Sequence, residues 1–144
     1  KRDHEELVLS AGAAYGIPAL ALRLFNVYGA RQALGNPYTG VAAIFGSRLL
    51  NGHAPIAFED GLQTRDFVHV DDVAEANMRA MASDIADATV NVGTGAGTSI
   101  KQLADAISPD QVFTEARKHD LRHTLADCSK LVSLLGWKPE LTIL

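Results

Sequence analysis

The sequence has a single cysteine, no excess of basic residues and no long apolar run, and each shortage excludes a class of protein. Cys128 alone cannot form an intrachain disulfide, so we expect a reducing compartment and a cytoplasmic location. Thirteen Lys and Arg against 17 Asp and Glu give a net charge of −4, which argues against nucleic acid as a partner. No apolar run approaches the roughly 18 residues of a membrane-spanning helix, so we expect no membrane contact.

Two common catalytic patterns are also missing. No Ser, His and carboxylate set has hydrolase spacing, and no Cys/His pattern matches a zinc site. His69 and Asp71 have too few further ligands near them in the sequence for a metal centre, so we expect no metal.

The chain has the composition of an ordinary globular domain. It has 144 residues, of which 47% are hydrophobic and 21% charged, so we expect one ordered domain. The first residue is Lys within a predicted helix, no signal peptide precedes it, and the last four residues are a largely apolar tail. We therefore expect a chain truncated at both ends.

Helical and strand patterns alternate along the sequence. Apolar periodicity and capping residues predict helices over residues 3–15, 40–50, 71 or 72 to 82, 100–107 and 130–135. Short apolar or alternating runs predict strands over residues 19–25, 55–59, 65–70, 89–92 and 111–115, and residues 26–38 a loop. Repeated alternation predicts an α/β fold with some parallel pairing.

A glycine-rich stretch at residues 93–99 invites a dinucleotide-binding interpretation. Its sixth position is Thr98 where the dinucleotide fingerprint needs glycine. We therefore favour a tight turn from a strand to a helix that Ser99 caps.

The densest polar cluster is RDFVHVDD at residues 65–72. Strand alternation puts Arg65, Phe67 and His69 on one face and the intervening residues on the other. The planar guanidinium of Arg65 suits a diphosphate because it donates paired, charge-assisted hydrogen bonds. The alternative is a surface pair of Arg65 and Asp66 followed by an Asp helix cap.

Two further polar positions are candidates for ligand contact. Asn26 follows a predicted strand, where ligands of open α/β sheets bind, although Asn also simply suits turns. The basic segment at residues 117–123 either clamps an anion or forms a solvated loop.

Four motifs in order give the chain a family resemblance. They are RLFNVYG at residues 23–29, GLQTRDFVHVDDVA at 61–74, NVGTG at 91–95 and LGWKP at 135–139. The chain resembles the extended short-chain dehydrogenase/reductases, and within them the NAD-dependent epimerase/dehydratase family that acts on nucleotide sugars. The resemblance implies the C-terminal part of a Rossmann-type enzyme with its small mixed α/β substrate-binding domain, without the glycine fingerprint of the NAD-binding half.

The resemblance also assigns roles to residues. Lys1 matches the lysine of the family's Tyr-x-x-x-Lys pair, a catalytic and cofactor-binding position, and the tyrosine would precede this chain. A fixed cation there favours a phenolate that can take a proton from a sugar hydroxyl. Phe25 would lie against the nicotinamide end of NAD. Asn26 and the helix start at Gly40 and Val41 would contact the substrate, the latter through backbone N–H groups.

The remaining assignments concern the nucleotide. Ile56, Ala57 and Phe58 would line the base pocket. Arg65 would grip the diphosphate with Phe67 nearby. Arg117 and Asp120 match the family's Arg-x-Gly-Asp, although His119 here replaces the glycine, which can adopt backbone angles that His resists.

The resemblance therefore implies a nucleotide-sugar epimerase that uses bound NAD to oxidise and re-reduce a UDP- or dTDP-sugar at C4. This chain would supply the nucleotide-sugar site and be inactive alone, and the parent would be a homodimer. The alternatives are a 4,6-dehydratase, a non-catalytic nucleotide-sugar-binding module, and a carbonyl reductase without a diphosphate grip.

Overall fold

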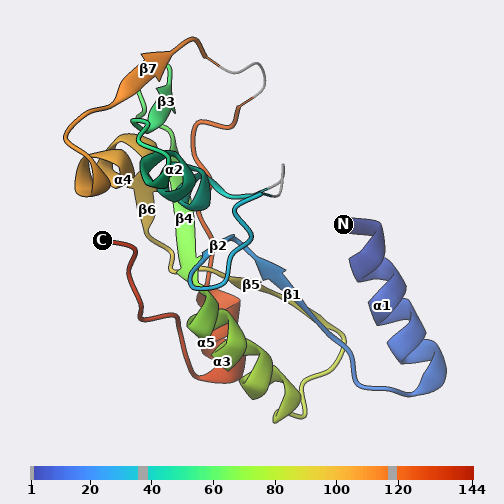
Figure 1. The fold of residues 1–144 in the computed structure, drawn as a ribbon. Coiled ribbons are helices and arrows are strands. Elements are labelled where there is room, and N and C mark those ends of the chain that lie inside the picture. The colour runs from blue at the N-terminus through green and yellow to red at the C-terminus, as the bar shows by residue number, and fades with distance from the viewer. Residues whose placement is uncertain (1, 36–38, 117–119) are drawn as a thin grey trace.

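The computed structural model of the chain describes residues 2–35, 39–116 and 120–144 and shows alternating helices and strands (Figure 1). The helices are α1 (Arg2–Tyr15), α2 (Val41–Leu50), α3 (Val70–Met81), α4 (Ile100–Ile107) and α5 (Ser129–Leu135). The strands are β1 (Leu20–Leu24), β2 (Asn26–Tyr28), β3 (Ile56–Phe58), β4 (Thr64–His69), β5 (Ala88–Val92), β6 (Gly97–Ser99) and β7 (Val112–Thr114). The predicted α/β class with parallel pairing is confirmed.

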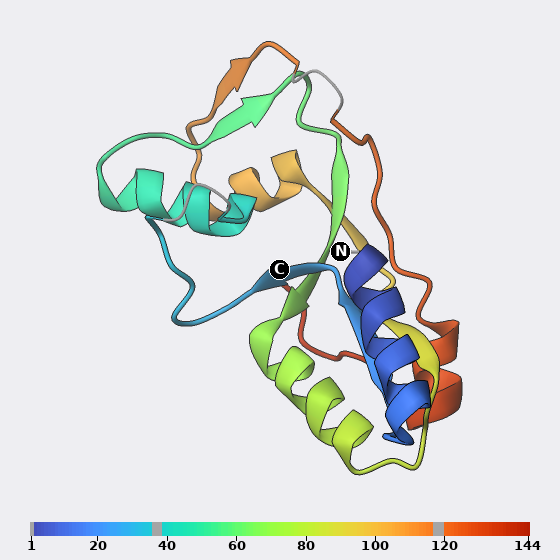
Figure 2. The same ribbon diagram turned by 90° about the vertical axis from the view of Figure 1, so that its right-hand side faces the viewer.

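One part of the molecule is a parallel strand pair between helices. β1 and β5 pair in parallel, from Leu20 opposite Ala88 to Leu24 opposite Val92. The α3 and α5 helices pack beside this pair, and α1 lies on the opposite side (Figures 1 and 2). α1 ends at Gly16, whose φ of +64° is the left-handed conformation that glycine adopts readily.

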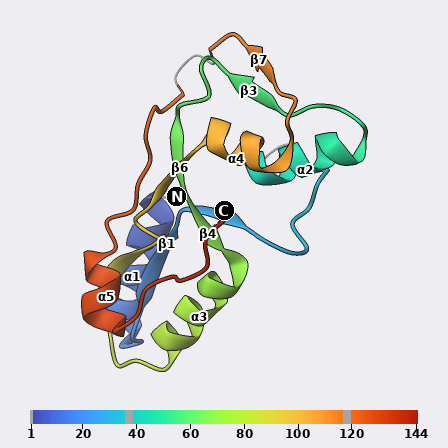
Figure 3. The ribbon, with the colours of Figure 1, turned by 90° about the vertical axis from the view of Figure 1, so that its left-hand side faces the viewer.

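β4 crosses the middle of the molecule and joins its two parts. It pairs in parallel with β2 and antiparallel with β6. Beyond it, β3 and β7 form a separate parallel pair, and α2 and α4 lie between that pair and β2 (Figure 3).

Alternation along β4 sends neighbouring side chains into two different cores. Phe67 packs with Phe45 of α2 and Leu103 of α4, while Val68 packs with Val90 of β5 and other residues of the second core. All five side chains are at least 96% buried. β4 is therefore the element that the two cores share.

Three local features differ from, or refine, the sequence-based predictions. The predicted loop at residues 26–38 begins with β2, because Asn26 pairs with Phe67 of β4. The predicted Asp cap of α3 is wrong, because the helix begins at Val70 and the His69 side chain accepts a hydrogen bond from the Asp71 N–H. Ser99 caps α4 as predicted, and Gln102 completes the reciprocal capping box.

Asp72, which lies within α3 and does not cap it, holds the C-terminal tail. Asp72 is buried, and its Oδ2 accepts a hydrogen bond of 3.0 Å from the Leu141 N–H. Ile143 packs against the core that contains Phe67. None of the helices in the described ranges combines the length and apolar character needed to cross a membrane.

Candidate nucleotide-sugar site

The central cavity lies between α2, β3, β4 and α4 and has a volume of about 310 Å³. That volume lies at the lower end of the range for small-molecule sites. Six of the lining residues are apolar and six are polar or charged. The lining residues are Asn26, Thr39, Val41, Ile44, Phe45, Arg48, Ile56, Phe58, Gln63, Arg65, Ile100 and Asp120.

A second, more open hollow adjoins the central cavity. Phe25 and Leu24 line it together with Thr124, and Asn26 and Arg65 belong to the walls of both. Phe25 stands directly after β1, and its N–H donates to the Val92 carbonyl at the end of β5. The hollow therefore lies at the carboxyl ends of two parallel strands, where ligands of α/β sheets bind.

Arg65 is fixed by oxygen atoms from two segments. Its Nη2 donates to Asp120 Oδ1 at 2.5 Å, and its Nη1 donates to the carbonyl oxygens of Leu121 at 2.7 Å and Thr64 at 2.8 Å. Only 15% of the side chain is exposed. The guanidinium is thus held in one orientation in the cavity wall, as a fixed cationic donor for an anion requires.

The alternative of a surface pair between Arg65 and Asp66 is wrong, because Asp66 is completely buried. Its Oδ1 accepts hydrogen bonds from the N–H and Oγ1 of Thr94, both at 2.8 Å. Its Oδ2 accepts from the N–H groups of Gly95 at 2.9 Å and Ala126 at 3.0 Å. Asp66 therefore joins β4 to the glycine-rich turn and to the segment that follows Asp120.

Gly93 must be glycine for this arrangement. A Cβ at that position would lie 2.6 Å from the Ala126 Cβ and 2.9 Å from Asp66 Oδ2. The glycine-rich stretch therefore packs closely against the buried carboxylate, in keeping with the predicted turn rather than with a dinucleotide fingerprint.

The start of α2 meets the cavity at Val41. Gly40 is the N-cap residue, has extended backbone angles and makes no side-chain capping bond. Val41 lines the cavity, whereas Gly40 does not. A helix N-terminus of this kind presents backbone N–H groups, which is consistent with the expected anion contact.

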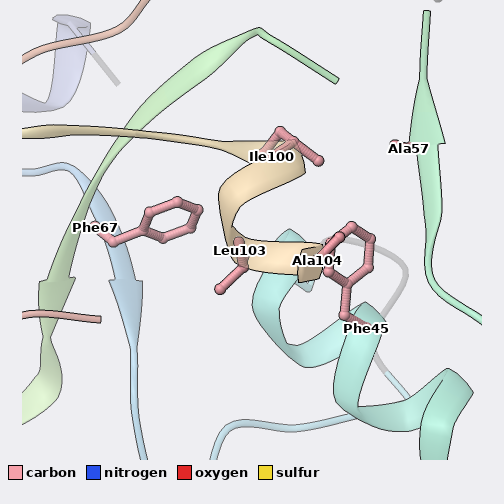
Figure 4. Close-up of a cluster of buried hydrophobic side chains, with 6 residues drawn as sticks. All are labelled: Phe45, Ala57, Phe67, Ile100, Leu103 and Ala104. Atoms are coloured by element: carbon pink, nitrogen blue, oxygen red, sulfur yellow. The ribbon is translucent and has the colours of Figure 1, made fainter. Parts of the chain in front are cut away.

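Two residues expected at the ligand lie in the core instead (Figure 4). Ala57 is fully buried in the core that contains Phe45 and Phe67. Alternation along β3 turns it away from the face that Ile56 and Phe58 share. Phe67 is 4% exposed and packs in the same core as Leu103 and Ala104, so it does not line the cavity. Ile56 and Phe58 do line it.

Lys1 and Arg117 lie outside the residues that the structure describes. Their expected roles, at the cofactor and at the diphosphate, remain predictions. Phe25, Asn26, Val41, Ile56, Phe58, Arg65 and Asp120 line the cavity or the adjoining hollow.

Several lining residues carry no strong signal in the sequence. Arg48 donates from Nε to the Ala54 carbonyl at 2.7 Å while lining the cavity. Gln63 lines the cavity too. Its position two residues before Arg65 is the one sequence signal for this placement, because side chains two residues apart on a strand share a face. Ile44, Phe45 and Ile100 read as ordinary apolar helix positions.

The segment carrying Asp120 is also held by a second ion pair. Arg122 donates to both carboxylate oxygens of Asp60, at 2.8 and 2.5 Å. These bonds, with a further one from the Leu62 N–H, lower the pKa of Asp60 from 3.8 to about 2. Both side chains are more than 40% exposed, so the pair orients the segment more than it stabilises the fold.

Cys128 has no sign of a reactive thiol. It donates to the Gly93 carbonyl at 3.1 Å, and burial raises its pKa above the ordinary value of 9.0. Within the described ranges, no three His, Cys, Asp or Glu side chains form a group that would hold a metal ion.

Comparisons with known proteins agree with this geometry. The profile of the NAD dependent epimerase/dehydratase family matches residues 1–93. The dTDP-L-rhamnose 4-epimerase of Burkholderia thailandensis is 40% identical over 97% of this chain and 40% of its own length. The UDP-glucose 4-epimerase of Mycolicibacterium smegmatis is 40% identical over 82% of this chain and 39% of its own.

A solved structure shows the same fold. The crystal structure of UDP-glucose 4-epimerase from Thermotoga maritima with UDP-glucose has a TM-score of 0.89 and 36% identity, and covers 99% of this chain and 48% of that one. The chain therefore spans less than half the length of these relatives. The match of the family profile, the identity to these relatives and the shared fold show that the chain belongs to the NAD-dependent epimerase/dehydratase family.

Proposed function

We propose that residues 1–144 form the C-terminal, nucleotide-sugar-binding portion of an NAD-dependent 4-epimerase acting on UDP- or dTDP-sugars. One observation carries the proposal: the fixed guanidinium of Arg65 lies in the wall shared by an apolar-sided cavity and the hollow at Phe25. A nucleotide sugar has the same order of parts, with a diphosphate between a flat base and a sugar.

Each part of the site has a physical role in this arrangement. Ile56 and Phe58 supply apolar surface for the base. Arg65 and the N–H groups at the start of α2 neutralise and orient the diphosphate. Asn26, at the junction of the cavity and the hollow, offers an amide to the sugar or diphosphate.

The residues at the hollow fit the nicotinamide end of NAD. Phe25 presents an aromatic side chain at the carboxyl ends of β1 and β5, next to the shared wall residue Asn26. NAD supplies a hydride acceptor and donor for oxidation and re-reduction of the sugar. Lys1 would hold a positive charge beside the group that takes the sugar's proton, which lowers the pKa of that group.

We also propose a cytoplasmic homodimer. The exposed Leu7 and Val8 on α1, at 67% and 51%, support a helix-mediated contact between two copies of the parent protein. Light scattering on the intact parent measures its mass, and a monomer at micromolar concentration contradicts the dimer.

The test of the function uses the intact parent enzyme loaded with NAD. It is incubated separately with UDP-galactose, UDP-glucuronate and dTDP-rhamnose, and the products are separated and identified by NMR. We expect one of these sugars to equilibrate with its C4 epimer. A 4-keto-6-deoxy product would assign a dehydratase instead, and binding of all three without turnover would assign a binding module.

A further inference from the structure

We infer that Asp60 and Arg122 are positioning residues for the diphosphate of the substrate, and that their ion pair sets the orientation of Arg65 without contact with the ligand. The inference rests on the proposed function and adds two residues that act on the site through a third. Neither Asp60 nor Arg122 lines the central cavity or the adjoining hollow.

Two of the three acceptors that hold Arg65 belong to one short segment. Asp120 supplies a carboxylate oxygen at 2.5 Å and Leu121 a carbonyl oxygen at 2.7 Å, and Arg122 follows them directly in the chain. Residues 120–124 belong to no helix or strand and run past the start of β4 toward α5 (Figure 3). The orientation of the Arg65 guanidinium therefore depends on where this segment lies.

Contacts with Thr64 hold the segment against β4. The Thr64 N–H donates to the Arg122 carbonyl at 2.9 Å, and the Thr124 N–H donates to the Thr64 carbonyl at 3.2 Å. The Thr64 hydroxyl also forms a hydrogen bond of 2.9 Å with His123 Nδ1. Because these three bonds meet at a single residue, they fix the distance of the segment from β4 better than they fix its direction.

The ion pair supplies an attachment to a different part of the molecule. Asp60 lies in the turn between β3 and β4, and its two carboxylate oxygens accept hydrogen bonds from the Arg122 guanidinium at 2.8 and 2.5 Å. Paired bonds between a planar guanidinium and a carboxylate fix direction as well as distance. The Arg122 side chain therefore holds the segment in one direction relative to the turn.

The turn that carries Asp60 is itself anchored. Asp60 Oδ1 accepts from the Leu62 N–H at 2.9 Å, and the Gly61 carbonyl accepts from the N–H of Lys101 in α4 at 2.8 Å. A Cβ at Gly61, whose φ is +69°, would lie 3.1 Å from the Lys101 Cβ, so the turn lies close against the helix. α4 also contributes Ile100 to the cavity wall. The pair thus connects the segment to a helix that lines the cavity.

The exposure of the pair favours a positioning role over a stabilising one. The Arg122 and Asp60 side chains are 42% and 43% exposed, and exposed ion pairs contribute little to the free energy of unfolding. A binding group must be held closely in its productive geometry, and its affinity for the ligand falls when its supporting residues are lost. We therefore expect the loss of this pair to change ligand binding more than it changes unfolding.

The experiment compares the binding of UDP and uridine to the intact parent protein by calorimetry. Uridine has the base and ribose of UDP but lacks the diphosphate, so its affinity does not depend on Arg65. Asp60→Asn keeps an acceptor for the Leu62 N–H but turns an amide N–H group toward Arg122, and Arg122→Met removes the cation. Each variant should weaken UDP binding by about fivefold, within the range for residues that act without touching the ligand. Uridine binding should change by less than about twofold.

Three further variants test whether the two residues act as a pair. Arg122→Lys keeps a cation that Asp60 can bind and should restore most of the UDP affinity. The double variant of Asp60→Asn and Arg122→Met should bind UDP no more weakly than the weaker single variant, because both substitutions remove the same interaction. Glu75→Gln is the matched control, because Glu75 is an exposed carboxylate that accepts from Arg79 at 2.6 Å on α3, outside the cavity. It should leave both affinities unchanged.

The outcomes separate the positioning role from the proposed function. If both single variants keep UDP affinity within about twofold of the wild type, the inference is overturned and the nucleotide site stands. An equal loss of UDP and uridine binding also overturns it, as does additivity in the double variant. Circular dichroism confirms folding, and Arg122→Gln replaces Arg122→Met if that variant does not fold. If the wild-type protein binds neither ligand, the proposed function fails as well.

Discussion

Arg65 and Asp120 form a hydrogen-bonded ion pair across 55 residues of sequence, with 2.5 Å between Nη2 and Oδ1. The pair closes one side of the central cavity, and the carbonyl oxygens of Thr64 and Leu121 hold the other guanidinium nitrogen. Because the guanidinium is already ordered, binding an anion would cost little further side-chain entropy.

Arg65→Ala in the intact parent should weaken UDP binding by about 1.5–3 kcal/mol, the scale of a hydrogen bond to a charged group. Isothermal calorimetry measures the change. Arg79→Ala is the control, because Arg79 lies on α3 over the Trp137 ring and outside the cavity. An affinity for UDP that Arg65→Ala leaves unchanged would remove the diphosphate assignment.

Lys1→Met should lower kcat by a factor of about 100 or more while leaving nucleotide-sugar affinity nearly intact, on the scale of general acid–base catalysis. The expected reason is that a neutral side chain no longer favours the deprotonated form of the neighbouring proton acceptor. Steady-state turnover and calorimetry on the same preparation separate the two effects. Wild-type turnover in this variant would end the proposed role of Lys1.

Asp66→Ala should destabilise the fold by roughly 3 kcal/mol or more, because the N–H groups of Thr94, Gly95 and Ala126 lose their buried acceptor. Urea unfolding followed by circular dichroism measures the loss. The exposed Asp84→Ala should change stability by no more than about 0.5 kcal/mol. Equal unfolding midpoints for the two variants would contradict this account of Asp66.

Gly93→Ala and Gly46→Ala are expected to change the stability of the fold in opposite directions. A Cβ at Gly93 meets Ala126 at 2.6 Å, so this change should cost about 1–3 kcal/mol, the usual scale of overpacking. A Cβ at Gly46, within α2, meets nothing within 4 Å, so this change should stabilise by about 0.5–1 kcal/mol. Thermal unfolding measures both, and a shift of the same sign in each would contradict the prediction.

The pair of Asp60 and Arg122 should make stability depend on acid pH. The pKa of Asp60 in the folded chain is about 2, below its ordinary 3.8, so the folded state binds the proton less readily than the unfolded state. The resulting stability is present above about pH 4 and is lost as pH falls toward 2. Urea midpoints between pH 2 and 7 should therefore converge for the wild type and Asp60→Asn at the acid end. A difference between the two midpoints that stays constant from pH 2 to pH 7 would contradict the predicted contribution of the Asp60 carboxylate to stability.

Much of the fold could be predicted because the spacing of apolar residues identifies the longer helices and strands. Every predicted helix and strand has a counterpart, since the apolar faces of α2, α4 and β1 are long enough to show a period. β2 and β6 were missed because three residues carry no period and both exist through pairing with β4.

The site could be predicted only in part. The expected residues Arg65, Asn26 and Phe58 line the cavity or its extension, while Ala57 faces the core because strand alternation, not motif membership, sets the direction of a side chain. Arg48 comes to the cavity from α2 through tertiary packing, which a single sequence does not reveal, whereas the position of Gln63 two residues before Arg65 could have indicated it.

The alternation of Phe67 and Val68 on β4 couples the two halves of the molecule thermodynamically. Unfolding of either core would remove β4 from the other core as well. The chain should therefore unfold as one cooperative unit. An anion held by Arg65, on the same strand, would then slow amide hydrogen exchange in β5, which does not line the cavity, as well as in α4, which does.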